Sequence, residues 1–478
     1  MKKFIASLEL RFSDLFLLLA AGSFALFIGV GQSFMNQMDL NANMPLPMWI
    51  FTIFGIMMIV FFGLYLYIEL FSKKEPYNKY VVMVFAFLIL LNLVAVLVQP
   101  ATGTEYVRVR FIPEGMTPPY HVGDLVPVSY QISAIHKLFF IFENIGMLLM
   151  IYSGLFVFPK RFKNLKFIEF LGYIMFAVCI FLAIYSYATE YSLYIGFIKY
   201  VTGIDRSSGD LGPYLVKSLF SHRNPLGMTY MLGIIFCYIN HSFSKKWWHY
   251  LLVGFLFINL IFTFCKTGIL LSVLVTFIYV IYRLIVTYKE HTKRNLVTLI
   301  SIGSVVVIAA IFVGVPYLTK GKILPSVYNL IQSITGGGLS LETRSYIWDN
   351  GFQIISNGWW LLGRGFGIPN LIVKPMNIIS HGEDFISLHS GFLTVLTEGG
   401  LFYFIAYLAF LIYSGYVIIK SYKVDKDLTI SVSLGVLTFL LYSLIESNHY
   451  LIYLFLFPIF ILYYQREVKK VEEKSNEA

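Results

Sequence analysis

Charged residues and cysteines are scarce in this chain of 478 residues. Only 13% of the residues are Asp, Glu, Lys or Arg, whereas 58% are hydrophobic and 18% are aromatic. The mean hydropathy is +0.74, and such a composition excludes an ordinary soluble globular protein. The three cysteines, Cys179, Cys237 and Cys265, lie in or beside apolar runs. Their spacing matches neither a metal site nor a disulfide framework, so we predict that they are packing residues.

Several motifs that carry chemistry are also missing. The chain has no Walker, His-Glu-x-x-His or Gly-x-Ser-x-Gly motif, and we expect neither a metal ion nor another cofactor. The glycines of LLGRGFG (361–367) lack dinucleotide-binding spacing and follow no predicted strand. They indicate a turn that needs positive φ or close backbone approach. The net charge of +10 is spread over short loops, which argues against a nucleic-acid surface.

Long apolar runs dominate what is present. Each is about 17–25 residues long, the length that crosses a bilayer core of roughly 30 Å as a helix. Because a helix satisfies its own backbone hydrogen bonds in lipid, the runs predict an all-α polytopic transmembrane bundle in one integral membrane domain, 1–478. We expect about twelve spans: 14–33, 49–71, 80–98, 136–157, 167–186, 226–241, 249–265, 268–286, 297–315, 390–419, 429–446 and 449–464.

Lysines and arginines gather in alternate loops. With twelve spans, every one of these sets falls on the same side, including the sets that contain Arg11, Lys73 and Arg161. Cationic loops are typical of the cytoplasmic side. The pattern therefore predicts that both termini are cytoplasmic, with a cytoplasmic tail at 465–478.

Three long loops then lie outside, at 99–135, 187–225 and 316–389. The first is rich in proline, so we expect an extended loop. The third lies between spans nine and ten and contains SLETRSYIWDNGFQII (340–355). This segment predicts an amphipathic helix flat on the membrane, with Ser340 as its N-cap and with Trp348, Phe352 and Ile355 in one stripe.

Three polar residues are the first candidates for chemistry. Lys266, in FTFCKTGILL, is a lone cation beside hydrocarbon, either snorkelling to an interface or facing an external cavity that suits phosphate. Arg344 on the amphipathic helix either contacts lipid head groups or holds a phosphate with its planar fork. His389 begins a span; it is either structural or a general base, because imidazole can accept a proton near neutral pH.

Other polar residues lie near span ends. In SHRNPLG (221–227), Asn224 can cap a helix, while His222 and Arg223 beside a helix N-terminus form a possible anion site. Glu398 lies inside a span, about two and a half helical turns beyond His389, and we expect it to be structural. Glu446 at an outer span end is an open candidate.

The order of short motifs resembles that of the O-antigen ligase and Wzy polymerase superfamily. The motifs are CKTGILL (265–271), ETRSYIW (342–348), LLGRGFG (361–367), SLHSGFLTVLTEGGL (387–401) and a final polar cluster. The resemblance covers about half of the chain, from 222 to 449. It implies a bacterial multi-span protein, in the plasma membrane, that transfers glycans from undecaprenyl diphosphate without a metal, with its active site on the outer face.

The resemblance also implies roles for individual residues. Arg344 matches the arginine of an R-x-x-x-W segment and would hold the diphosphate. His389 matches a histidine that would act as base toward an acceptor hydroxyl. Lys266 stands where the family commonly has arginine, so the charge remains but the bidentate fork is lost. Arg223 is similar in position to a further cationic residue.

Our leading hypothesis is therefore a polymerase that joins lipid-linked repeat units of a capsule, exopolysaccharide or O-antigen by inverting transfer. The runner-up is a ligase that moves a finished glycan to another acceptor, and sequence does not separate the two. A lipid-linked oligosaccharide flippase is the alternative of another class, but the chain lacks the internal repeat common in transporters. The expected partners are the lipid-linked donor and acceptor, membrane lipids and, as a candidate, a chain-length regulator.

Overall fold

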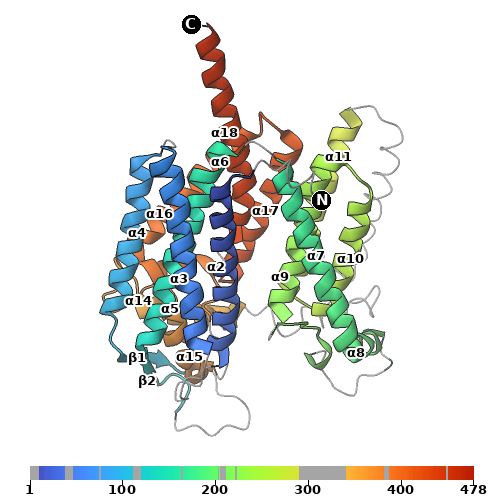
Figure 1. Cartoon of the computed structure of the whole chain (residues 1–478). Helices are drawn as coiled ribbons and strands as arrows, with labels where there is room; N and C mark the ends of the chain where they lie inside the picture. The colour runs from blue at the N-terminus through green and yellow to red at the C-terminus, as the bar shows by residue number, and fades with distance from the viewer. Residues whose placement is uncertain are drawn as a thin grey trace. The chain divides into compact units, whose positions relative to one another are not determined.

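The computed structural model describes residues 10–37, 47–74, 77–110, 120–162, 165–202, 204, 212–220, 223–289, 341–381, 387–447 and 451–477. Most of these residues are helical, as Figure 1 shows. The long helices are α2 (Phe12–Gln37), α3 (Pro47–Leu66), α4 (Lys79–Val98), α5 (Ala134–Tyr152), α7 (Lys166–Thr189), α9 (Arg223–Ser244), α10 (Trp248–Thr263), α11 (Lys266–Lys289), α16 (Gly391–Ser421), α17 (Lys426–Ile445) and α18 (Ile452–Glu477).

A helix lies at each predicted span within these residues, and the ninth span, 297–315, lies outside them. Seven of the described helical segments are long and apolar enough to cross a membrane. The chain is therefore a multi-pass helical membrane protein, while the number twelve stays a prediction. The shorter helices are α6 (Phe158–Arg161), α8 (Tyr191–Thr202), α14 (Leu341–Ser356) and α15 (Ile368–His381), with one 3-10 turn, η3 (Gly212–Tyr214).

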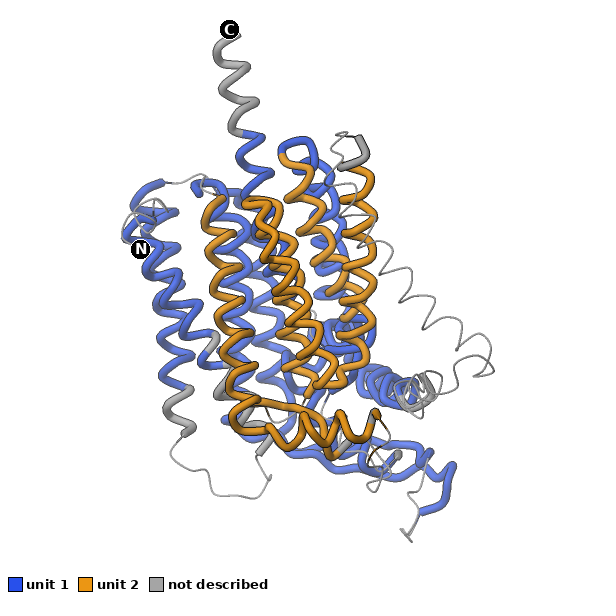
Figure 2. Tube along the Cα trace, turned by 90° about the vertical axis from the view of Figure 1, so that its right-hand side faces the viewer, with its two compact units in different colours: residues 1–164, 341–424, 443–478 blue, residues 165–340, 425–442 orange. Residues whose placement is uncertain are grey.

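The chain divides into two compact units, coloured separately in Figure 2. Unit 1 contains 1–164, 341–424 and 443–478, and unit 2 contains 165–340 and 425–442. Each unit is thus assembled from segments that are far apart in the sequence. Helix α17 begins in unit 2, and its last residues, from Ser443, belong to unit 1.

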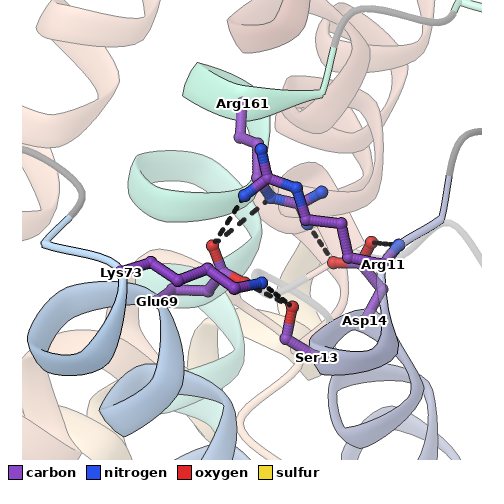
Figure 3. Close-up of polar contacts among 6 residues, drawn as sticks. All are labelled: Arg11, Ser13, Asp14, Glu69, Lys73 and Arg161. Atoms are coloured by element: carbon purple, nitrogen blue, oxygen red, sulfur yellow. Dashed lines mark hydrogen bonds and ion pairs between the residues drawn. The ribbon is translucent and has the colours of Figure 1, made fainter.

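A cluster of charged side chains, in which Glu69, Asp14 and Arg161 are buried, lies at one end of unit 1, and Figure 3 shows its contacts. Helix α3 continues into the π-helix η1 (Tyr67–Ser72), where Glu69 is fully buried and lies 3.1 Å from Lys73 Nζ. Helix α5 continues through a second π-helix, η2 (Ser153–Val157), into α6, whose Arg161 pairs with Asp14 and lies 3.5 Å from Glu69. Arg11 Nη1 lies 3.6 Å from the same carboxylate. The cationic sets around Arg11, Lys73 and Arg161 therefore meet at one end of this unit, as the span count predicted.

A two-stranded antiparallel hairpin lies at the other end of α4, which is about 30 Å long. Strand β1 (Thr102–Arg108) pairs with β2 (Leu125–Gln131), with Glu105 opposite Val128. The expectation of extended loop was wrong for these residues. The side chains alternate between buried and exposed, most clearly along β2, and this period of two outweighs the proline at 127, which an edge strand tolerates. In Figure 1 the hairpin and α15 lie at the lower end of unit 1 and α6 at its upper end.

Helices α14 and α15 pack with the hairpin and the start of α16 around one apolar core. On α14 the buried residues are Ile347, Asn350, Gly351, Ile354 and Ile355, whereas Phe352 is 49% exposed. The predicted stripe was therefore wrong at Phe352, because the buried face follows positions i, i+3, i+4, i+7 and i+8 from Ile347. The predicted N-cap, Ser340, lies outside the described residues.

Candidate active site

Helix α14 places Arg344 next to the end of α17. Arg344 Nη1 donates a hydrogen bond to the carbonyl oxygen of Ile445, and Nη2 lies 3.5 Å from Glu446 Oε1. The last carbonyls of a helix have no partner within the helix, so a guanidinium here satisfies one of them and interacts favourably with the helix dipole. The side chain is 23% exposed. Arg344 is therefore held at a fixed place while part of it remains open to solvent.

His389 projects from a sharp turn before α16. Leu388 is fully buried, His389 has φ of +47°, and Ser390 caps the helix by accepting a hydrogen bond from Leu393 N. Positive φ is uncommon outside glycine, and histidine is among the residues enriched there. Trp348, one turn beyond Arg344, donates its indole N–H to the His389 carbonyl oxygen at 3.4 Å. One helix thus positions both Arg344 and the backbone of His389.

Glu446 joins the two side chains. Its Oε2 lies 3.1 Å from His389 Nδ1, and its Oε1 faces Arg344. An ionised carboxylate only accepts hydrogen bonds, so the tautomer of His389 that fits this contact has its proton on Nδ1 and its lone pair on Nε2. The carboxylate is 12% exposed and His389 is 17% exposed. The arrangement offers a proton acceptor, a cation for an anionic group, and a carboxylate that orients both.

The glycine-rich turn (361–367) packs closely against a kink in α16. Gly363, Gly365 and Gly367 all have positive φ, and so does Gly400 within the helix. A Cβ at Gly363 would lie 2.4 Å from Gly400 N, and Gly367 N donates to Glu398 Oε1 at 2.9 Å. The prediction of positive φ and close backbone approach is confirmed. Glu398 accepts this backbone hydrogen bond while buried, which fits the structural role expected for it.

The sequence analysis missed a second ion pair, between Arg364 of this turn and Glu105 of the hairpin. The two side chains are 3% and 4% exposed. Arg364 Nε also donates to the Ile354 carbonyl oxygen at 2.7 Å, and the guanidinium lies 4.8 Å from the ring centre of Trp359. Burial raises the pKa of the nearby Tyr130 hydroxyl, and the positive charge of Arg364 opposes that rise. A lone arginine among glycines and apolar residues was a signal that an acidic partner exists, although not which one.

The other predicted cations belong to unit 2. Arg223 and Asn224 begin α9, and Lys266 begins α11 directly after a turn in which Phe264 has φ of +51°. A Cβ at Gly227, on the first turn of α9, would lie 2.3 Å from Cys265 Cβ, so the starts of α9 and α11 lie side by side. Both helix N-termini and both cations favour an anion at this end of unit 2. His222 lies outside the described residues.

Within the residues that the structure describes, no three His, Cys, Asp or Glu side chains are grouped as metal ligands would be. A family model described as O-antigen ligase (Wzy_C) matches residues 251–408, about a third of the chain. The matched segment contains Lys266, Arg344, His389 and Glu398, whereas Arg223 and Glu446 lie outside it. No curated protein and no solved structure matches the chain significantly.

Proposed function

The chain belongs to the O-antigen ligase/Wzy superfamily of glycosyltransferase-like ligases and polymerases, and we propose on that premise that it polymerises lipid-linked oligosaccharide repeat units into a surface polysaccharide. The donor would be an undecaprenyl-diphosphate-linked glycan at the outer face of the bacterial plasma membrane. The observation that supports this most strongly is Glu446, which lies between His389 and Arg344. A ligase that uses the same donor remains the second candidate, because the family includes both activities.

In the proposed reaction, an acceptor hydroxyl oxygen attacks the anomeric carbon of the donor sugar. The bond from that carbon to the phosphate oxygen breaks, and the lipid diphosphate leaves with the bonding electrons. His389 Nε2 takes the proton of the hydroxyl, while Glu446 keeps Nδ1 protonated and stabilises the imidazolium that forms. A single displacement of this kind inverts the anomeric configuration.

The leaving group gains negative charge as the glycosidic bond breaks. A cation that is already in place stabilises this charge without reorganisation at the moment of reaction. Arg344 has the planar fork that suits phosphate, and its contact with Ile445 holds it in position. For unit 2 taken by itself, we propose that Lys266 and Arg223, at the adjoining starts of α11 and α9, are diphosphate-binding cations.

The first test is His389→Ala in the source organism, with His121→Ala as the matched control. His121 is an exposed histidine in the turn of the hairpin. Surface polysaccharide and lipid-linked glycans are separated on gels, with the amount of the protein measured in parallel. We expect His389→Ala to abolish polysaccharide and accumulate single lipid-linked repeat units, and His121→Ala to resemble the wild type.

The other outcomes separate the candidates. Accumulation of long lipid-linked chains in His389→Ala identifies a ligase instead of a polymerase. Normal polysaccharide in that variant, at normal protein level, removes His389 from the chemistry and overturns the proposed mechanism. Retained anomeric configuration in the new linkage overturns the single displacement.

A further inference from the structure

One carboxylate serves two groups with opposite requirements in the candidate active site. Glu446 Oε1 lies 3.5 Å from Arg344 Nη2, and Oε2 lies 3.1 Å from His389 Nδ1. A base works better next to a negative charge, because the charge stabilises its protonated form. A phosphate-binding arginine works worse when an internal carboxylate already neutralises it. Both requirements cannot be met by an immobile Glu446 once a diphosphate is present.

The anchoring of Arg344 shows which contact can change. Nη1 is bound to the Ile445 carbonyl oxygen, a backbone atom at the end of α17, and the side chain is only 23% exposed. The guanidinium therefore keeps its place when its other partner changes. The Nη2 contact is an ion pair at 3.5 Å, longer than a direct hydrogen bond. Glu446, by contrast, holds His389 at hydrogen-bond distance.

From this geometry we infer that Glu446 occupies the anion position of Arg344 in the empty enzyme and is displaced toward His389 when a diphosphate binds. The inference rests on the proposed function, because it assigns the diphosphate to Arg344. The incoming negative charge replaces Oε1 at Nη2 and repels the carboxylate. The full negative charge of Glu446 then acts on the imidazole. Glu446 is thus a positioning residue that links donor binding to the strength of the base.

This exchange has a chemical consequence. With Arg344 paired, the charge of Glu446 is shared, and His389 is a weaker base toward any hydroxyl or water that reaches it. With the diphosphate in place, the base is strengthened at the moment when the anomeric carbon is present. The exchange of Glu446 between Arg344 and His389 thus favours glycan transfer to an acceptor that binds after the donor.

The first experiment measures binding of inorganic pyrophosphate to the full-length protein in lipid nanodiscs by titration calorimetry. Glu446→Gln removes the competing charge at nearly constant volume, so we expect it to bind pyrophosphate on the order of fivefold more tightly than the wild type. Arg344→Ala should abolish this binding. Asp349→Asn is the matched control, because it removes a carboxylate from α14, the helix that carries Arg344. The Asp349 side chain is 60% exposed and lies 3.5 Å from Arg110. We expect that control to change the affinity less than twofold.

Equal or weaker binding of pyrophosphate by Glu446→Gln overturns the exchange. An equal gain in Asp349→Asn also overturns it, since the effect would then be one of net charge alone. Glu446→Asp keeps the charge but withdraws the carboxylate from Arg344 by one methylene group, so its affinity for pyrophosphate should lie between those of the wild type and Glu446→Gln. This second variant keeps the test decisive if Glu446→Gln fails to fold, because weaker binding by the aspartate variant than by the wild type contradicts the inference.

The second readout is transfer activity in membranes that contain the native lipid-linked donor. Glu446→Gln should lower both the KM for the donor and kcat, whereas a merely structural defect lowers kcat and raises or keeps KM. Glu446→Asp should recover part of kcat. If His389→Ala and Arg344→Ala transfer glycan at the wild-type rate, the proposed function itself fails. If both are inactive but Glu446→Gln leaves KM unchanged, only the exchange fails.

Discussion

The buried pair of Glu105 and Arg364 allows a quantitative prediction about how the hairpin is held in unit 1. Both side chains are almost inaccessible, at 4% and 3% exposed. Removing one partner of a buried ion pair costs about 3–5 kcal/mol, because the other charge is left without compensation. In Glu105→Ala, Arg364 would keep its hydrogen bond to the Ile354 carbonyl oxygen and its contact with the Trp359 ring. We therefore expect the lower end of that range, about 3 kcal/mol.

Replacing both members of the pair should have a much smaller effect. In Glu105→Met combined with Arg364→Met, no charge is buried, and such replacements are often neutral. Asn357 would still lose its acceptor, since its Nδ2 donates to Glu105 Oε2 at 2.8 Å in the structure. The Ile354 carbonyl oxygen would also lose Arg364 Nε as its donor, and each lost hydrogen bond of this kind costs about 1 kcal/mol. The double variant should therefore be more stable than either single variant.

The assay is hydrogen exchange, followed by mass spectrometry, of peptides that cover 102–131 in the full-length protein in nanodiscs. A loss of about 3 kcal/mol corresponds to roughly 150-fold faster exchange through opening of the hairpin. Arg108→Ala, on the exposed face of β1, is the control and should leave exchange unchanged. Exchange in Glu105→Ala within threefold of the wild type, or additive losses in the double variant, would refute the reasoning.

Two further substitutions test the geometry of the site. Arg344→Lys keeps the charge but loses the planar guanidinium that contacts both Ile445 and Glu446. The rate of glycan transfer in membranes should therefore fall about tenfold, which corresponds to about 1.4 kcal/mol. Transfer at the wild-type rate would contradict the two-point contact. Gly400→Ala puts a Cβ 2.3 Å from the Leu361 carbonyl oxygen at φ of +66°, which should cost about 1–3 kcal/mol or more and lower the melting temperature in detergent. Gly415→Ala on the same helix has open space around its Cβ and should melt like the wild type; equal melting of both variants would show that the kink is not required.

Local physical chemistry was enough to determine most of the helices. An apolar run in a membrane protein has few alternatives to a helix, because the backbone must satisfy its own hydrogen bonds. The same reasoning placed the cations near Arg11, Lys73 and Arg161 at one end. It also predicted positive φ in the turn around Gly363, because that preference belongs to glycine itself. The alternation along 125–131 is typical of a strand, but the prolines of this loop favoured the expectation of an extended loop, which was wrong here.

Pairings between distant residues were decided only by the tertiary structure. Glu446 lies 57 residues from His389 in the sequence, and no periodicity connects the end of α17 with the turn before α16. Arg364 pairs with Glu105, which is 259 residues away in the sequence, because the hairpin and the glycine-rich turn pack against the same core. The sequence by itself determined which segments are helical and which side chains can carry charge or protons. Packing determined which of them share a carboxylate, because contact at long sequence separation is a property of the folded chain.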